Sequence, residues 1–216
     1  MTRSVFNPNM NFQDFDKLKT SLRYWLMGRD YTQAIKAMEF AMGYHTGTRK
    51  NGDPEFIHQL SQVQYARTLE KQLIDPEGTF VTLFLHDVME DYGVKFHDIE
   101  GMFGGEVAQS VFLMTNCESD GTKKNTDMYY GLMADDPRAS FGKASDRLHN
   151  LSTMIGVFGS EKQMSYCEQS NNLIIPMLKK ARTVFPEQEA AYHNVKHILE
   201  IQMELIRAIN VPLKQH

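Results

Sequence analysis

The strongest constraint on the fold is an Asp-Pro pair that occurs three times, each time before apolar residues at helical spacing. The pairs occupy positions 53–54, 75–76 and 136–137. An aspartate side chain accepts hydrogen bonds from the free N–H groups of a helix start, and proline is favoured at the first helical position because it has no N–H to leave unpaired. We therefore predict that a helix begins at each pair.

Other segments also predict helices. Apolar residues recur at helical spacing after Asp30, and Ser160 and Pro186 open two further long helices, the last reaching about Asn210. The apolar run 80–85 could alone form a buried strand, but its proline start and the continuing periodicity favour one helix that Gly93 ends. We predict an all-α fold, a bundle of roughly eight or more helices.

The bulk properties exclude several classes of protein. The 216 residues include 23 basic and 27 acidic side chains, a formal charge of −4, which gives no support to nucleic-acid binding. The two cysteines, Cys117 and Cys167, form neither a disulfide framework nor a thiolate metal motif. The sequence has neither a signal peptide nor an apolar run of the roughly 18 residues that a membrane span needs. We expect a cytoplasmic protein without nucleic-acid or membrane partners.

The domain organisation is expected to be simple. We predict a single domain over residues 1–216, with a core that carries the motifs at about 30–155 and C-terminal helices at about 160–210. The last helix has more apolar positions than one packing face requires, so a homo-oligomer is possible. Two loops, Thr46 to Asp53 and Asn116 to Thr126, are of the polar kind that commonly holds binding residues.

The densest cluster of ionisable residues lies directly after the apolar run. His86, Asp87, Glu90 and Asp91 would share a broad face if this segment were one helix. An imidazole and three carboxylates beside a core-facing segment carry a large desolvation cost, which a divalent cation would offset.

Two more residues could complete a set of metal ligands. His58 and Asp146 both lie among apolar neighbours on predicted helices, so both could point inward. Two histidines and two aspartates would leave positions on a metal open for water and a phosphate oxygen. From the residues alone the alternative stays open, namely a satisfied core histidine and an acidic helix end.

Four segments in this order resemble the hydrolase half of RelA/SpoT-type alarmone enzymes. They are TRKNGDPEFIHQ (48–59), FLHDVMEDY (84–92), FGGEVAQSV (103–111) and KASDRLHN (143–150). The resemblance implies an HD-type domain, so named after its His-Asp pair, in a small stand-alone hydrolase that splits (p)ppGpp into GDP or GTP and pyrophosphate. The alternatives are an HD phosphohydrolase for an adenine alarmone, for the 2′-phosphate of NADPH or for a deoxynucleotide, and a nucleotide-binding module without catalysis.

The resemblance also implies roles for individual residues. It implies that His58, His86, Asp87 and Asp146 bind one divalent cation, typically Mn²⁺, and that Glu90 and Asp91 position or deprotonate the attacking water. The resemblance places Arg49, Lys50, Asn150 and Thr153 at the nucleotide. Asn51, next to the basic pair, and Lys143 and Arg147, which flank Asp146, are further candidates for substrate binding, and the alternative for Lys143 and Arg147 is a solvated charge on the helix.

Three positions depart from the family pattern. Asn51 replaces its serine, Gln59 replaces the proline after the metal histidine, and Ala144-Ser145 replaces Leu-Ala before Asp146. These departures leave the expected metal ligands in place. They put the base and the positions of the substrate phosphates in doubt.

Overall fold

The computed structural model describes residues 12–117 and 122–210. Within these ranges there is no β-strand, only isolated bridges at Thr48–Pro54 and Cys117–Lys123, so the all-α prediction is confirmed. The α-helices are α1 (Phe12–Gly28), α2 (Thr32–Tyr44), α3 (Ile57–Ala66), α4 (Pro76–Leu85), α5 (Val88–Tyr92), α6 (Phe96–Phe103), α7 (Gly105–Met114), α8 (Thr126–Met133), α9 (Pro137–Thr153), α10 (Ser160–Gln169), α11 (Ile175–Val184) and α12 (Glu189–Asn210). Arg67–Gln72 and Pro186–Gln188 form 3-10 helices, and Ser170–Ile174 forms a π-helix between α10 and α11.

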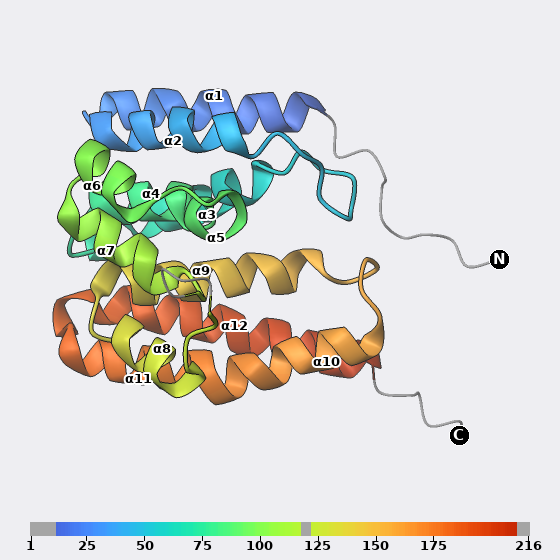
Figure 1. Ribbon diagram of the computed structural model, residues 1–216. Helices are drawn as coiled ribbons and strands as arrows, with labels where there is room; N and C mark the ends of the chain where they lie inside the picture. Colours follow the sequence, from blue (N-terminus) through green and yellow to red (C-terminus); the bar gives the residue numbers. More distant parts are fainter. Residues whose placement is uncertain (1–11, 118–121, 211–216) are drawn as a thin grey trace, which may run out of the picture.

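Helix α4 is the centre of the bundle. Every residue from Gly78 to Leu85 is buried, because the helix packs against α2, α3, α7 and α9 at once. Figure 1 shows α1 and α2 side by side on one side of this layer, and α9 to α12 on the other. Since α9 contacts both α4 and the long helix α12, it joins the two halves of the molecule.

Two of the three Asp-Pro predictions are confirmed. Asp75 accepts a hydrogen bond from the backbone N–H of Gly78 at the start of α4. Asp136 accepts from the N–H groups of Arg138 and Ala139 at the start of α9. The third prediction is wrong, because α3 begins only at Ile57. Asp53 lies in the loop instead, where its carboxylate accepts from the side-chain amide of Asn51 at 2.6 Å.

The predicted single helix from Pro76 to Gly93 is also wrong. Helix α4 ends at Leu85, the backbone turns at His86 and Asp87, and the short helix α5 follows. Gly93 does end α5, in the left-handed conformation with φ of 67° that glycine adopts without strain. The histidine and the carboxylates therefore do not share one helical face. They lie in and after the turn between α4 and α5.

The remaining helices show where local signals were weak. Helices α1, α6, α7 and α8 have no Asp-Pro start and were not predicted individually. Part of the predicted loop Asn116 to Thr126, residues 118–121, lies outside the described residues. No helix in the described part of the chain is long and apolar enough to cross a membrane. On α12, Ile201, Leu205 and Ile209 are exposed, and the homo-oligomer stays a prediction.

The cap of α9 yields a first testable prediction. Asp136 accepts two backbone N–H groups, at 2.9 and 2.7 Å, and also the hydroxyl of Ser110 on α7. We expect Asp136→Ala to lower the free energy of unfolding by about 1–2 kcal/mol, measured by urea denaturation, because these donors lose their acceptor.

Asp135→Ala is the matched control for this prediction. Asp135 forms a surface ion pair with Lys180, and both side chains are about half exposed. Such pairs contribute little, so the control should change stability by less than about 1 kcal/mol. An equal loss in both variants would contradict the capping role of Asp136.

Candidate metal centre and adjoining pocket

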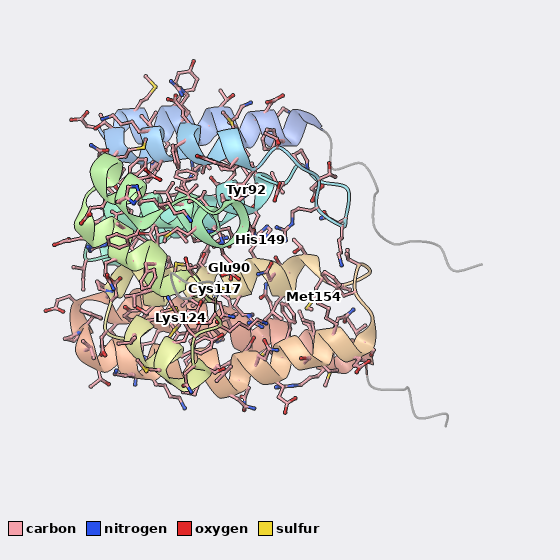
Figure 2. All side chains as sticks on the ribbon, viewed as in Figure 1. Glu90, Tyr92, Cys117, Lys124, His149 and Met154 are labelled. Carbon is pink, nitrogen blue, oxygen red and sulfur yellow. The ribbon has the colours of Figure 1, made fainter. Side chains whose placement is uncertain are left out.

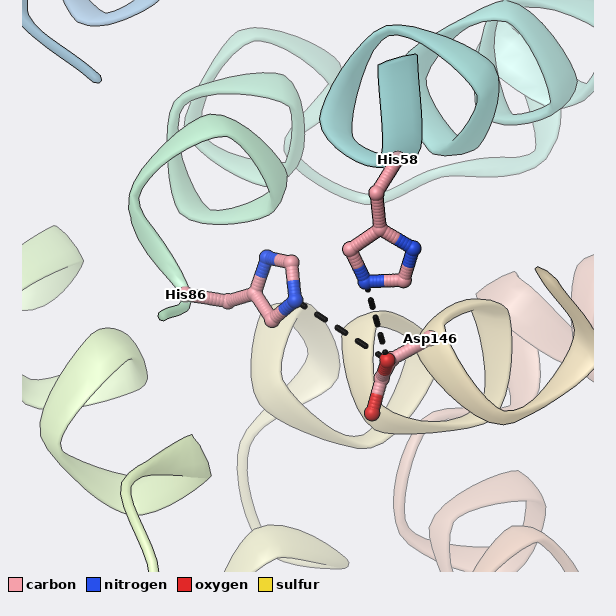
Figure 3. A group of neighbouring side chains, drawn as sticks. All are labelled: His58, His86 and Asp146. Atoms are coloured by element: carbon pink, nitrogen blue, oxygen red, sulfur yellow. Dashed lines mark ion pairs between the residues drawn. The ribbon is translucent and has the colours of Figure 1, made fainter. Parts of the chain in front are cut away.

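The four predicted metal ligands come from two helices and one turn, and lie close together. His58 is on α3, His86 and Asp87 form the turn after α4, and Asp146 is on α9. The Nε2 atoms of His58 and His86 lie 3.2 and 3.9 Å from Oδ1 of Asp146. Figure 3 shows both imidazole rings pointing toward this carboxylate. Asp87 joins from the other side, with Oδ2 at 2.9 Å from Nε2 of His86 and 3.8 Å from that of His58.

Both imidazoles are held so that Nε2 faces the cluster. Nδ1 of His86 donates to the carbonyl of Leu83 at 2.9 Å, which turns Nε2 toward the carboxylates. Nδ1 of His58 lies 2.8 Å from Nδ1 of His149, one turn beyond Asp146 on α9. Burial and the nearby charges of His58 and Arg49 lower the pKa of His149 to about 3, so its ring is neutral and can accept. Metal-binding histidines usually have such a partner on their second nitrogen.

The electrostatics of the cluster favour a positive ion. Burial alone would lower the pKa of His86, but the carboxylates of Asp87 and Asp146 outweigh it and raise the pKa to about 9. Burial would likewise raise the pKa of Asp146, yet the hydrogen bond with His58 and the charge of Lys143 hold it well below its usual range. Because His58, His86 and Asp146 have ligand atoms within 4.8 Å of one another, the residues fit a divalent cation bound by nitrogen and oxygen.

A polar cavity of about 260 Å³ opens onto the cluster. Glu90, Asp91 and Lys143 line it together with His58, Asp87 and Asp146. Figure 2 shows Glu90 and His149 in the region between α5 and α9. Glu90 is held in place by the backbone N–H of Asn116, at 2.9 Å from Oε2.

Asp91 has an unusual protonation equilibrium. Burial and the neighbouring carboxylates of Asp87 and Glu90 raise its pKa to about 6. A carboxylate with a pKa in this range can both accept and return a proton near neutral pH.

A second pocket adjoins the first. It also measures about 260 Å³, and Lys50, Asn51, Thr153 and Phe158 are among its lining residues. Arg49 lines both pockets, and its guanidinium donates to the side-chain oxygen of Asn150 at 3.4 Å. The Asn150 amide in turn donates to Oδ1 of Asp146 at 2.7 Å. Arg49 and Asn150 therefore connect the second pocket to the candidate metal centre.

Two predicted substrate residues have other partners. Arg147 lines neither pocket; its guanidinium stacks on Tyr166 and donates to Gln169 on α10. One residue after Asp146 on a helix is about 100° around the axis, which turns Arg147 away from the cavity. Asn51 lines the second pocket, but its amide group is hydrogen bonded to Asp53.

Sequence reasoning missed three buried side chains at the centre. Gln59 was noted only as a departure from the family pattern, yet its amide nitrogen lies 3.5 Å from Oδ2 of Asp87 and 3.3 Å from Nε2 of His45. His45 lines the cavity. Gln62 contacts both metal-site histidines. Its position four residues after His58 on one helix was the available signal.

The bundle brings His58, Asp87 and Asp146 to one cavity, with His86 directly beside them, as expected for an HD-type domain. No protein-family model matches the chain. Individual proteins are nevertheless similar to it in sequence. The chain is 28% identical over 180 residues to a probable guanosine-3′,5′-bis(diphosphate) 3′-pyrophosphohydrolase of Synechocystis, covering 76% of this chain and 23% of that protein. It is 29% identical over 177 residues to the same kind of protein in Aquifex aeolicus, covering 80% of the chain and 25% of the relative.

A third relative and a solved structure give the same result. A GTP pyrophosphokinase rsh of Brucella ovis is 30% identical over 158 residues, which are 68% of this chain and 20% of that protein. The fold matches a solved structure of a metazoan orthologue of SpoT, described as hydrolysing ppGpp, with a TM-score of 0.55, 22% identity, and coverage of 81% of this chain and 95% of that chain. The resemblance predicted from the motifs is confirmed: the chain is related to the RelA/SpoT-type alarmone enzymes. It spans only a fifth to a quarter of the length of these three curated relatives.

The geometry of the cluster predicts how metal binding depends on its residues. We expect purified protein to retain a divalent cation, and His58→Ala or Asp146→Ala to lose most of it, because each removes a donor from a small buried set. Elemental analysis measures the metal content. Removal of the metal from the wild type should also lower its melting temperature, since the ion binds the folded site better than the unfolded chain.

His97→Ala is the matched control for the metal content. The His97 side chain is 78% exposed and lies on α6, outside the cluster. This variant should keep the metal content of the wild type. Equal metal in all the variants would show that the ligands are assigned wrongly.

Proposed function

We propose that the chain is a metal-dependent phosphohydrolase that removes pyrophosphate from the 3′ position of (p)ppGpp. The observation that carries the proposal is the connection between the two pockets. The cavity with the His/Asp cluster and the acidic pair adjoins a pocket with basic and aromatic side chains, and Arg49 lines both. The names of the relatives support the same substrate.

We propose Mn²⁺ as the resident ion, with His58, His86, Asp87 and Asp146 as its ligands. Imidazole and carboxylate donors together suit borderline divalent metals. When bound, such an ion supplies Lewis-acid activation of water and of a phosphate oxygen. We further propose that the described helices act as one catalytic domain in the cytoplasm. The free cysteines Cys117 and Cys167 are compatible with that compartment.

The side chains of this protein would carry out the remaining steps. Asp91, with Glu90 beside it, accepts the proton of a water molecule whose oxygen attacks the phosphorus bound to the ribose 3′ oxygen. The bond between that phosphorus and the 3′ oxygen breaks, pyrophosphate leaves, and the 3′ oxygen takes up a proton. Lys143 and Arg49 line the cavity and offset the negative charge that grows on the phosphate oxygens.

The second pocket, lined by Arg49, Lys50 and Phe158 among others, is suited to a purine nucleotide. Lys50 lies over the ring of Phe158, with Nζ 5.1 Å from its centroid, and Lys162 lies on the same ring at 4.1 Å. An aromatic face next to the planar guanidinium of Arg49 can hold a base, while the ammonium groups hold phosphates. Glu55 also lines both pockets. A carboxylate here can accept from N–H or O–H groups of another nucleotide, so NADPH and deoxynucleotides belong in the same assay.

Substitution of the acidic pair, Glu90 and Asp91, tests whether the protein is an enzyme or only binds nucleotides. We expect Glu90→Gln with Asp91→Asn to keep nucleotide and metal binding while lowering turnover of ppGpp about 100-fold or more, as for loss of general acid–base catalysis. The assay measures pyrophosphate and GDP from the Mn²⁺-loaded protein.

A double variant of exposed acids on α10, Glu161→Gln with Glu168→Gln, is the control and should turn over like the wild type. Wild-type rates in the Glu90/Asp91 variant would refute the water-activating role. A wild type that hydrolyses nothing in the nucleotide panel would favour the binding module. Orthophosphate from NADPH, with ppGpp left intact, would keep the site but change the substrate.

Arg49 tests recognition of the nucleotide. Arg49→Lys keeps the charge but loses the planar group that can stack on a base. We expect KM for ppGpp to rise about tenfold, which corresponds to about 1.4 kcal/mol, while hydrolysis of a small generic phosphodiester stays nearly unchanged. Arg182→Lys, in the surface network with His193 and Glu189, is the control. Equal damage to both substrates would point to a phosphate or structural role for Arg49.

A further inference from the structure

Gln62 is buried in the candidate metal centre although no motif includes it. It lies one turn after His58 on α3 and is 1% exposed. Its amide nitrogen Nε2 is 2.8 Å from Nε2 of His58 and 3.5 Å from Nε2 of His86. Its carbonyl oxygen Oε1 has no hydrogen-bond partner among the described residues. A buried glutamine that leaves its oxygen unpaired is costly unless another ligand uses it.

The hydrogen bonds around the two histidines limit what this amide can do. Nδ1 of His86 donates to Leu83 and Nδ1 of His58 contacts His149, so both Nε2 atoms face Gln62 and Asp146. The amide nitrogen of Gln62 occupies this space, 2.8 Å from Nε2 of His58 and 3.5 Å from Nε2 of His86. With an ion, the lone pairs are directed at the metal, and an N–H group there has no acceptor left.

A rotation of the amide group removes this conflict. Turning it by half a revolution exchanges nitrogen and oxygen and directs Oε1 to the two Nε2 atoms. In its present position Oε1 has no partner, so the rotation breaks no hydrogen bond of that oxygen. The carbonyl oxygen of an amide is a suitable donor to Mn²⁺ or Mg²⁺.

The distances fit neighbouring ligands of one ion. Two donors that each lie about 2.1 Å from a metal, at right angles, are about 3.0 Å apart. The Gln62 amide atom is 2.8 and 3.5 Å from the two Nε2 atoms. The pairs of predicted ligands, His58 with Asp146 and His86 with Asp87, are 3.2 and 2.9 Å apart. Gln62 thus lies at the same spacing as the ligands themselves.

We propose that Gln62 is an additional ligand of the divalent cation and binds it through the side-chain oxygen Oε1. The proposal rests on the metal of the proposed function and adds a donor to it. An extra oxygen shifts the preference of the site toward Mn²⁺ and away from metals that favour nitrogen and sulfur donors. It also removes one position that water would otherwise occupy.

The test uses three variants of the full chain. Gln62→Ala removes the donor and leaves room for water, Gln62→Glu keeps an oxygen at the same place, and Gln64→Ala is the matched control. Gln64 is two residues further along the same helix, which places it on the opposite side of α3. Titration of the metal-free proteins with Mn²⁺, followed by electron paramagnetic resonance, gives the affinity. The water proton relaxation rate of the loaded proteins counts the water molecules on Mn²⁺.

We expect Gln62→Ala to bind Mn²⁺ about tenfold more weakly or worse and to carry one additional water on the ion. Gln62→Glu should bind at least as tightly as the wild type with the same number of waters, and Gln64→Ala should match the wild type in both. Thermal melting of the metal-free proteins checks that each variant folds. If Gln62→Ala fails to fold, Gln62→Asn takes its place, because its side chain is one methylene shorter, withdraws the oxygen from the ion and should give the same weaker binding and added water.

Two results would overturn the proposal. Wild-type affinity and water count in Gln62→Ala would show that Gln62 is not a ligand. Weaker binding without an added water would show that Gln62 only supports the histidines. A wild type that binds no Mn²⁺ would instead contradict the metal of the proposed function, which is a separate outcome.

Discussion

The site depends on where the buried helix α4 stops. This helix is apolar on all sides because other helices cover it on every face, so its C-terminal end lies inside the molecule and not at its surface. A polar group at such an end must be satisfied by other polar groups. His86 meets this demand through Leu83 on one nitrogen and through Asp87 and Asp146 on the other. The position of α9, which supplies Asp146, and that of α3, which supplies His58, follow from packing against the same helix.

The sequence predicted those parts of the fold that depend on neighbouring residues. Asp75 and Asp136 cap their helices because their carboxylates accept from backbone N–H groups of the first turn. Asp53 has the same local sequence but pairs with Asn51, and its carbonyl accepts from Arg49 in a tight loop. The turn at His86 could not be foreseen from periodicity. It depends on Asp146, sixty residues further along the chain, and on a carbonyl one turn back.

The ligands were easier to predict than the substrate residues. The structure brings the four expected metal ligands together because each lies on a helix that packs on α4 or at its end. Whether a predicted substrate residue on α9 reaches the cavity depends on the side of the helix on which it lies. Asn150 is four residues after Asp146 and shares its face, whereas Arg147 is one residue after it and faces α10. A motif quoted as a string of letters does not distinguish these two positions. Gln62 was missed for a related reason, since it belongs to the cluster by helical spacing and not by motif.

The balance of charge at the centre explains why the site and the fold are linked. Five carboxylates line one cavity, those of Glu55, Asp87, Glu90, Asp91 and Asp146, together with the basic side chains of Arg49 and Lys143. The raised pKa of Asp91, caused by burial and by Asp87 and Glu90, is a sign of this crowding. A carboxylate whose pKa is higher in the folded protein than in the unfolded chain favours folding at low pH, and this contribution is lost as the pH rises through about 6. Near neutral pH the metal-free fold therefore carries a repulsion that a divalent cation would relieve. Binding energy at such a centre is also folding energy, because the unfolded chain cannot bring α3, α4 and α9 together.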